Sequence, residues 1–176
     1  MSKIAIPLDQ ADEGLKLIAA NIHMFIQDHY ALMQQASNWH AMALAIFALE
    51  ELVKYSELKH MKQEALRRGV TSIELDERLF GRGRKSHEYK LKLAKDQALI
   101  PADAWIINSA KFDSAYFGSA YFDTEDVVIT AALRVSNLYV DWEERWQIGT
   151  DSFEPLRLKH FADSILLAFE KMGEAM

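Results

Sequence analysis

The chain has 176 residues, 50% of them hydrophobic and 26% charged, so its length and composition fit a single globular domain over residues 1–176. The absence of cysteine excludes disulfide frameworks, thiolate metal sites and cysteine nucleophiles. The formal net charge of −6 at pH 7 excludes a uniformly basic nucleic-acid coat, so any such binding depends on a local basic patch.

No segment predicts export or membrane insertion. The first seven residues contain one lysine and no long apolar stretch, unlike a signal peptide. The longest apolar run covers only residues 41–49, whereas a membrane-spanning helix needs about 20 apolar residues. We therefore expect a soluble, cytoplasmic protein.

The first half of the sequence predicts two long helices. Over residues 8–35, apolar side chains recur at steps of three and four residues, which gives one apolar stripe. A second helix is expected over residues 39–68 and ends at Gly69. Residues 39–49 are apolar on nearly every side, so this helix should be the central and most buried one.

The second half predicts shorter elements after a loop at residues 70–85. These are helices at residues 86–98 and 103–121 and from about residue 124, a hairpin at residues 138–148, and a last helix from Pro155 to Gly173. The hairpin is indicated by a change of the apolar period to two. The expected fold class is all-α, a bundle of five or six helices with a small β-hairpin between the last two.

A basic segment at residues 82–95 is the first candidate for chemistry, because it has six Lys or Arg residues and one Glu. Such a cluster attracts phosphates, and a histidine such as His87 transfers protons near neutral pH. Together, Arg82 and His87 could cleave RNA without a metal, with the arginine on the scissile phosphate and the histidine activating the 2′-hydroxyl. A solvated basic helix would have the same pattern. The residues expected to contact RNA are Arg84, Lys85 and Lys90.

A second candidate is the charged group Glu50, Glu51 and Lys54, directly after the most apolar stretch. Glu50 and Lys54 are four residues apart, so one interpretation is an ordinary pair along the helix surface. The other is that a carboxylate at the end of an apolar helix faces other helices and needs a cationic partner or belongs to a site. The sequence leaves both open.

A metal site has weaker support. Glu57 and His60 form an E-x-x-H pair of the kind found in di-iron bundles, but such sites need a second copy and two further glutamates. No second copy exists, and the other histidines lie singly on different predicted helices. No G-x-S-x-G elbow or glycine-rich phosphate loop is present either. We expect no metal and no cofactor.

Several segments in this order resemble one known family. They are the A-x-E-E-x-x-K element ending at Lys54, the stretch from Phe80 through His87 to Leu91, the L-Y-V-D element at residues 138–141, and the downstream Pro155. Over roughly residues 11–170 the chain resembles the AbiV family of bacterial abortive-infection (phage-defence) proteins, within the HEPN superfamily. The resemblance implies a helical bundle that usually dimerises, and many HEPN proteins are metal-independent RNases or toxins.

The resemblance also implies roles for individual residues. Arg82 and His87, with four residues between them, match the family's Arg/His signature. His87 would help to activate the 2′-hydroxyl and Arg82 would hold the phosphate, leaving a 2′,3′-cyclic phosphate end. Glu50, Glu51 and Lys54 match a polar cluster that would support the site. A homodimer would bring two copies of the motif into one cleft.

The sequence leaves a second class of function open, a non-catalytic helical interaction module that binds a phage or host translation protein. Exposed aromatic residues of the predicted hairpin, such as Trp142 and Trp146, would then form the contact surface. The nuclease predicts that His87→Ala abolishes RNA cleavage or toxicity in a folded protein. The binding module predicts little effect of that change.

Overall fold

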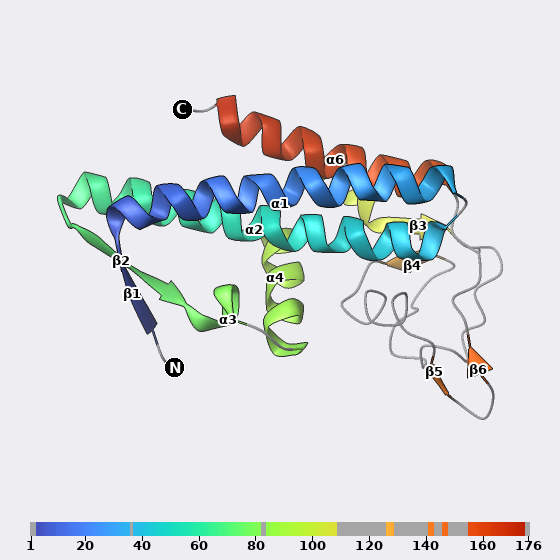
Figure 1. Cartoon of the computed structure of the whole chain (residues 1–176), viewed down its shortest axis with the longest axis horizontal. Coiled ribbons are helices and arrows are strands. Elements are labelled where there is room, and N and C mark those ends of the chain that lie inside the picture. The colour runs from blue at the N-terminus through green and yellow to red at the C-terminus, as the bar shows by residue number, and fades with distance from the viewer. Residues whose placement is uncertain are drawn as a thin grey trace.

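The computed structural model describes residues 3–35, 37–81, 84–108, 126–128, 141–142, 146–147 and 155–174. Three long helices run side by side along its longest axis (Figure 1): α1 (Leu8–Gln34), α2 (Asn38–Arg68) and α6 (Pro155–Glu174). Because only three residues connect α1 to α2, these helices form an antiparallel pair, and α6 packs against both. The all-α class is confirmed for the described residues.

The helix α2 is the centre of the core, as its composition predicts. Between Ala41 and Leu49, all side chains except Leu44 and Phe47 are fully buried. The helix ends at Gly69, whose φ of 66° is readily adopted only by a residue without a side chain. Despite this apolar stretch, no helix in the described part of the chain is both long and apolar enough to cross a membrane.

The helix α1 covers one side of α2 through a single buried face. Its buried residues recur at intervals of three, four and seven, which is the spacing of one helical face. They are Ala11, Ile18, Ile22, Ile26 and His29. Helix α6 contributes a similar face to the same core, with Leu158, Phe161 and Ile165 fully buried.

Helix α4 (Arg84–Asp96) lies across α2 rather than along it, as Figure 1 shows. It buries Leu91 and Ala94 in the common core. Between α2 and α4, the chain forms strand β2 (Ser72–Asp76) and then the single helical turn α3 (Glu77–Phe80). Strand β2 pairs antiparallel with β1 (Lys3–Pro7) from the N-terminus. This arrangement brings the first turns of α4 against the middle of α2.

The predicted loop over residues 70–85 is corrected, because it contains strand β2 and helix α3. The predicted helix from residue 103 is also corrected at its start. A short 3₁₀ turn, η1 (Ala102–Trp105), leads into strand β3 (Ile106–Asn108). Strand β4 (Asp126–Val128), within the helix expected from about residue 124, pairs antiparallel with β3. Residues 109–125 and 129–140, which include the remaining parts of these predicted helices, lie outside the described residues.

The hairpin expected between the last two helices is only a small part of the strand structure in the described residues. The longest strand pair is β1–β2 near the N-terminus, which joins segments about 70 residues apart in the sequence. At the predicted place, the structure describes only two-residue strands, β5 (Asp141–Trp142) and β6 (Trp146–Gln147), which pair antiparallel. Local alternation of apolar residues does not report a pairing between distant segments, which is why β1–β2 was missed.

Candidate functional site

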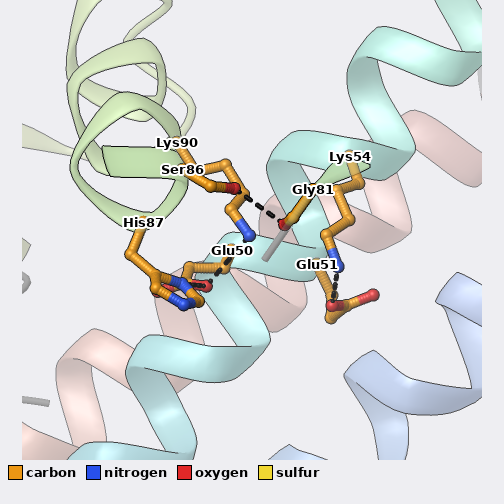
Figure 2. Close-up of polar contacts among 7 residues, drawn as sticks. All are labelled: Glu50, Glu51, Lys54, Gly81, Ser86, His87 and Lys90. Carbon is orange, nitrogen blue, oxygen red and sulfur yellow. Dashed lines mark hydrogen bonds and ion pairs between the residues drawn. The ribbon is translucent and has the colours of Figure 1, made fainter. Parts of the chain in front are cut away.

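The site centres on Glu50, whose carboxylate lies between α2 and α4. Its side chain is only 4% exposed, because it follows the fully buried stretch of α2 by one residue. One carboxylate oxygen, Oε2, lies 2.6 Å from Nδ1 of His87 and 3.3 Å from Nζ of Lys90. His87 and Lys90 are three residues apart on α4 and therefore share one face of that helix, which Figure 2 shows turned toward Glu50. Two helices thus position one carboxylate, one imidazole and one amine together.

The geometry assigns the tautomer of His87. An ionised carboxylate only accepts hydrogen bonds, so Nδ1 of His87 carries the proton that Glu50 accepts. In the neutral imidazole this leaves Nε2 as the basic nitrogen. No described residue bonds Nε2, and the His87 side chain is 17% exposed, so one edge of the ring reaches the surface. The arrangement therefore provides an oriented imidazole with an accessible basic atom.

Lys90 is buried on the inner side of this group. Its side chain is only 2% exposed, and its amine approaches the same Glu50 oxygen as His87. Burial lowers the pKa of Lys90, while the Glu50 carboxylate opposes this effect. The sequence prediction placed Lys90 among the RNA contacts, but in this conformation its amine faces the protein interior.

The start of α4 is fixed by a tight turn at Gly81. The Gly81 N–H donates to the carbonyl of Glu77 at 2.7 Å, and a Cβ atom at position 81 would lie 2.2 Å from that same oxygen. Only glycine fits there without a shift of the backbone. The Ser86 hydroxyl then donates to the Gly81 carbonyl at 2.9 Å, which ties the end of α3 to the first turn of α4 (Figure 2).

The basic residues of the connection are only partly described. Arg82 and Gly83 lie outside the described residues. Arg84 and Lys85 form the first turn of α4, but their side chains also lie outside what is described. Arg82 follows Gly81 directly in the sequence, so the turn that Ser86 fixes ends one peptide bond before it.

The structure decides between the two interpretations of the charged group on α2. Lys54 pairs with Glu51, three residues earlier on the same helix, and not with Glu50. Glu50 instead reaches across to α4, as expected for a carboxylate at the end of an apolar helix. Glu51 and Lys54 are partly exposed and form a pair separate from the His87 contact (Figure 2).

Among the described side chains, no group of three or more His, Asp or Glu residues lies together as metal ligands would. The two residues of the E-x-x-H pair on α2, Glu57 and His60, lie in different surroundings. Glu57 accepts a hydrogen bond from Gln97, and His60 is exposed. The described residues therefore offer no donor set resembling a di-iron site.

The model of the AbiV family of HEPN domains matches residues 10–154. The chain belongs to the AbiV family. This places the protein among abortive-infection proteins of the HEPN type. No curated protein and no solved structure matches the chain. The match includes Glu50, His87 and Lys90, so the site lies inside the family domain.

In this AbiV protein, the structure brings together two of the predicted site residues, Glu50 and His87, and places Lys90 beside them at a buried position that the sequence prediction missed. A signal for it was present. Ser86, Lys90 and Ala94 recur every four residues, and all three are buried. Lys90 therefore continues a face of small residues, which was hidden by the many lysines around it. A basic residue on such a face is expected to pair with a buried carboxylate.

Proposed function

We propose that this AbiV protein is a metal-independent ribonuclease that acts as a toxin in abortive infection, with His87 as its general base. The observation that carries the proposal is the hydrogen bond of 2.6 Å from Nδ1 of His87 to the buried Glu50 carboxylate. It orients the ring and leaves Nε2 as the atom that receives a proton. Family membership supports the link to abortive infection.

In the proposed reaction, Nε2 of neutral His87 takes the proton of a ribose 2′-hydroxyl. The 2′-oxygen then attacks the adjacent phosphorus, and the bond from phosphorus to the 5′-oxygen of the next nucleotide breaks. The products are a 2′,3′-cyclic phosphate and a 5′-hydroxyl, to which a proton is returned. No water is consumed in this step. Glu50 stabilises the imidazolium that forms, because its carboxylate lies against Nδ1.

The phosphate would be held by the basic residues before and within the first turn of α4. We propose Arg82 for the scissile phosphate and Arg84 and Lys85 for neighbouring ones, since Arg82 precedes His87 with the spacing of the HEPN signature. The net charge of −6 opposes RNA binding elsewhere on the protein. Binding should therefore weaken steeply as the salt concentration rises.

We also propose that the active form is a homodimer, as the HEPN superfamily resemblance implies. Leu17 and Met24 on α1 are 59% and 46% exposed, and their spacing of seven residues places them on one face of that helix. Exposed apolar side chains on one face favour association. Light scattering on the purified protein tests this proposal, since a dimer would have about twice the monomer mass of 20.2 kDa.

The decisive experiment is RNA cleavage in EDTA by the wild type, His87→Ala and His60→Ala. His60 is an exposed histidine on α2 and serves as the matched control. Cleavage by the wild type and His60→Ala that leaves cyclic-phosphate ends, with loss in folded His87→Ala, is the expected result. Equal cleavage by all three proteins would overturn the role of His87. No cleavage of total RNA or tRNA by any of them would favour the interaction module, to be tested by a pull-down from infected cells.

A further inference from the structure

The buried amine of Lys90 adds a third member to the Glu50–His87 pair. Both Nδ1 of His87 and Nζ of Lys90 lie within 3.3 Å of the same carboxylate oxygen. We infer that Lys90 is a positioning residue: its ammonium keeps Glu50 ionised, so that Glu50 accepts the Nδ1 proton of His87 and Nε2 remains the basic nitrogen. The meaning of this role for RNA cleavage rests on the function proposed above, but the role itself does not.

The charges around Glu50 favour this assignment. A buried carboxylate without a cation would draw a proton, either onto itself or onto the imidazole beside it. With the ammonium of Lys90 present, the carboxylate is already balanced, and His87 can stay neutral. Among the described side chains, the charged neighbours on α2 are Glu51 and Lys54, which pair with each other and act on the pKa of Lys90 in opposite directions. On α3, Arg78 is paired with Asp76.

A purely structural role explains Lys90 poorly. Replacing a buried ion pair by apolar residues of similar size is often neutral or stabilising, so the burial of this pair does not by itself argue that it holds α4 on α2. The neighbouring contacts of α4 are already apolar, through Leu91 and Ala94. A role in contacting phosphate is also poorly explained, since the side chain is 2% exposed. Control of the charge on Glu50 accounts for both its burial and its partner.

The test is a pH titration of the protein with ¹⁵N-labelled histidine, read by NMR. In the wild type, neutral His87 should carry its proton on Nδ1. In Lys90→Met, the Glu50–His87 pair should hold one additional proton at neutral pH. This appears either as imidazolium in the spectrum at neutral pH or as a switch of the neutral ring to the Nε2–H tautomer. Both results differ from the wild-type spectrum.

Two variants serve as controls. Lys90→Arg keeps the positive charge and should retain the wild-type midpoint and tautomer. Lys92→Met removes an exposed lysine of the same helix, which pairs with Asp96, and should change neither. If Lys90→Met does not fold, Lys90→Gln replaces it, because its amide still donates a hydrogen bond to Glu50 but has no charge. The same shifts are expected for Lys90→Gln.

The inference is overturned if the folded neutral variant at position 90 titrates like the wild type and keeps its tautomer. This readout needs no RNA, so it separates the two proposals. If Lys90→Met changes the protonation of His87 as expected but the wild type cleaves no RNA, the nuclease proposal is contradicted and the role of Lys90 stands. If cleavage requires His87 but is the same with and without the charge at position 90, the nuclease proposal stands and the role of Lys90 is contradicted.

Discussion

Two histidines each donate a hydrogen bond through Nδ1 to an oxygen of α2, but the acceptors and the surroundings of the two rings differ. His29, on α1, is fully buried and lies 2.7 Å from the backbone carbonyl of Ala41. His87, on α4, lies 2.6 Å from a carboxylate and keeps part of its ring at the surface. Within the described residues, Nε2 of His29 is buried without a hydrogen-bond partner. Burial lowers the pKa of His29, so this ring is held neutral in the core.

The comparison distinguishes His29, which packs in the core, from His87, whose contact with a carboxylate suits the proton transfer proposed above. A neutral carbonyl fixes the tautomer of a ring but gives no support to its charged form. A carboxylate does both, and the part of the His87 side chain that stays exposed would, in the proposed function, give a substrate access to the ring. The sequence distinguishes the two residues only by their neighbours, since His87 lies in the basic segment at residues 82–95 and His29 lies in the first predicted helix, near its apolar stripe.

The largest expected difference between the two histidines concerns RNA cleavage. Removing a general base typically lowers the rate by about a hundredfold or more, so His87→Gln should lose at least that much activity. His29→Gln should retain the wild-type rate per folded molecule, because its ring has no access to a substrate. The rates are compared in EDTA, with the folded fraction taken from circular dichroism. Equal losses in the two variants would remove the distinction.

Stability should show the reverse order. His29→Ala leaves a cavity in the core and removes a hydrogen bond to the Ala41 carbonyl, so we expect a loss of about 2–4 kcal/mol in the free energy of unfolding. His87→Ala removes a partly exposed ring and should cost about 1 kcal/mol. Urea unfolding of both variants measures the difference. A greater loss for His87→Ala would mean that the Glu50 pair mainly supports the fold.

The pH dependence of stability gives a finer test of His29. Its pKa in the folded protein lies below the unfolded value of about 6.5, because burial disfavours the charged ring. The unfolded chain therefore binds more protons as the pH falls below about 6.5, and the free energy of unfolding decreases there by up to about 1.4 kcal/mol per pH unit. Above that pH, this contribution of His29 is constant.

The variant His29→Gln should flatten this acid-side slope, while His60→Gln, at an exposed position on α2, should leave it unchanged. Two other groups act on the His29 ring. Asp163 opposes the lowering through its charge, and the ring of Tyr30 packs against it edge-on. Asp163 titrates well below this pH window, because Lys159 and Tyr30 lower its pKa against the opposing effect of burial. An unchanged slope in His29→Gln would show that other groups cause the acid sensitivity.

The parts of the fold that local patterns dictate were predictable. Helices α1 and α2 begin and end within about one residue of the predicted bounds, since an apolar stripe and the glycine at position 69 mark them. The sheet β1–β2 was not predictable in this way. Helices α1 and α2 separate its two strands in the sequence, so the strands meet only when these helices pack together. The same holds for β3–β4, whose strands were included in predicted helices.

The same distinction between local sequence patterns and helix packing applies to the candidate site. Glu50 could be found because a carboxylate directly after a fully apolar stretch requires a partner. The identity of that partner depended on how α4 crosses α2, and the sequence offered Lys54 equally well. The interior position of Lys90 likewise follows from the crossing and not from the basic character of the segment.

The smallest expected effect concerns the neighbours of Glu50, which sharpen the contrast between buried and exposed charges. Glu51 and Lys54 pair with each other at 12% and 20% side-chain exposure, and neither bonds His87. The double variant Glu51→Gln/Lys54→Met removes both charges together, so the net charge near Lys90 is unchanged. We expect a loss of about 0.5 kcal/mol in stability and less than about a threefold change in cleavage. Glu50→Gln should reduce cleavage far more, because it removes the charge that supports the His87 imidazolium. Side-by-side cleavage assays measure the ratio, and comparable losses would mean that the whole charged group of α2, and not Glu50 alone, supports the histidine.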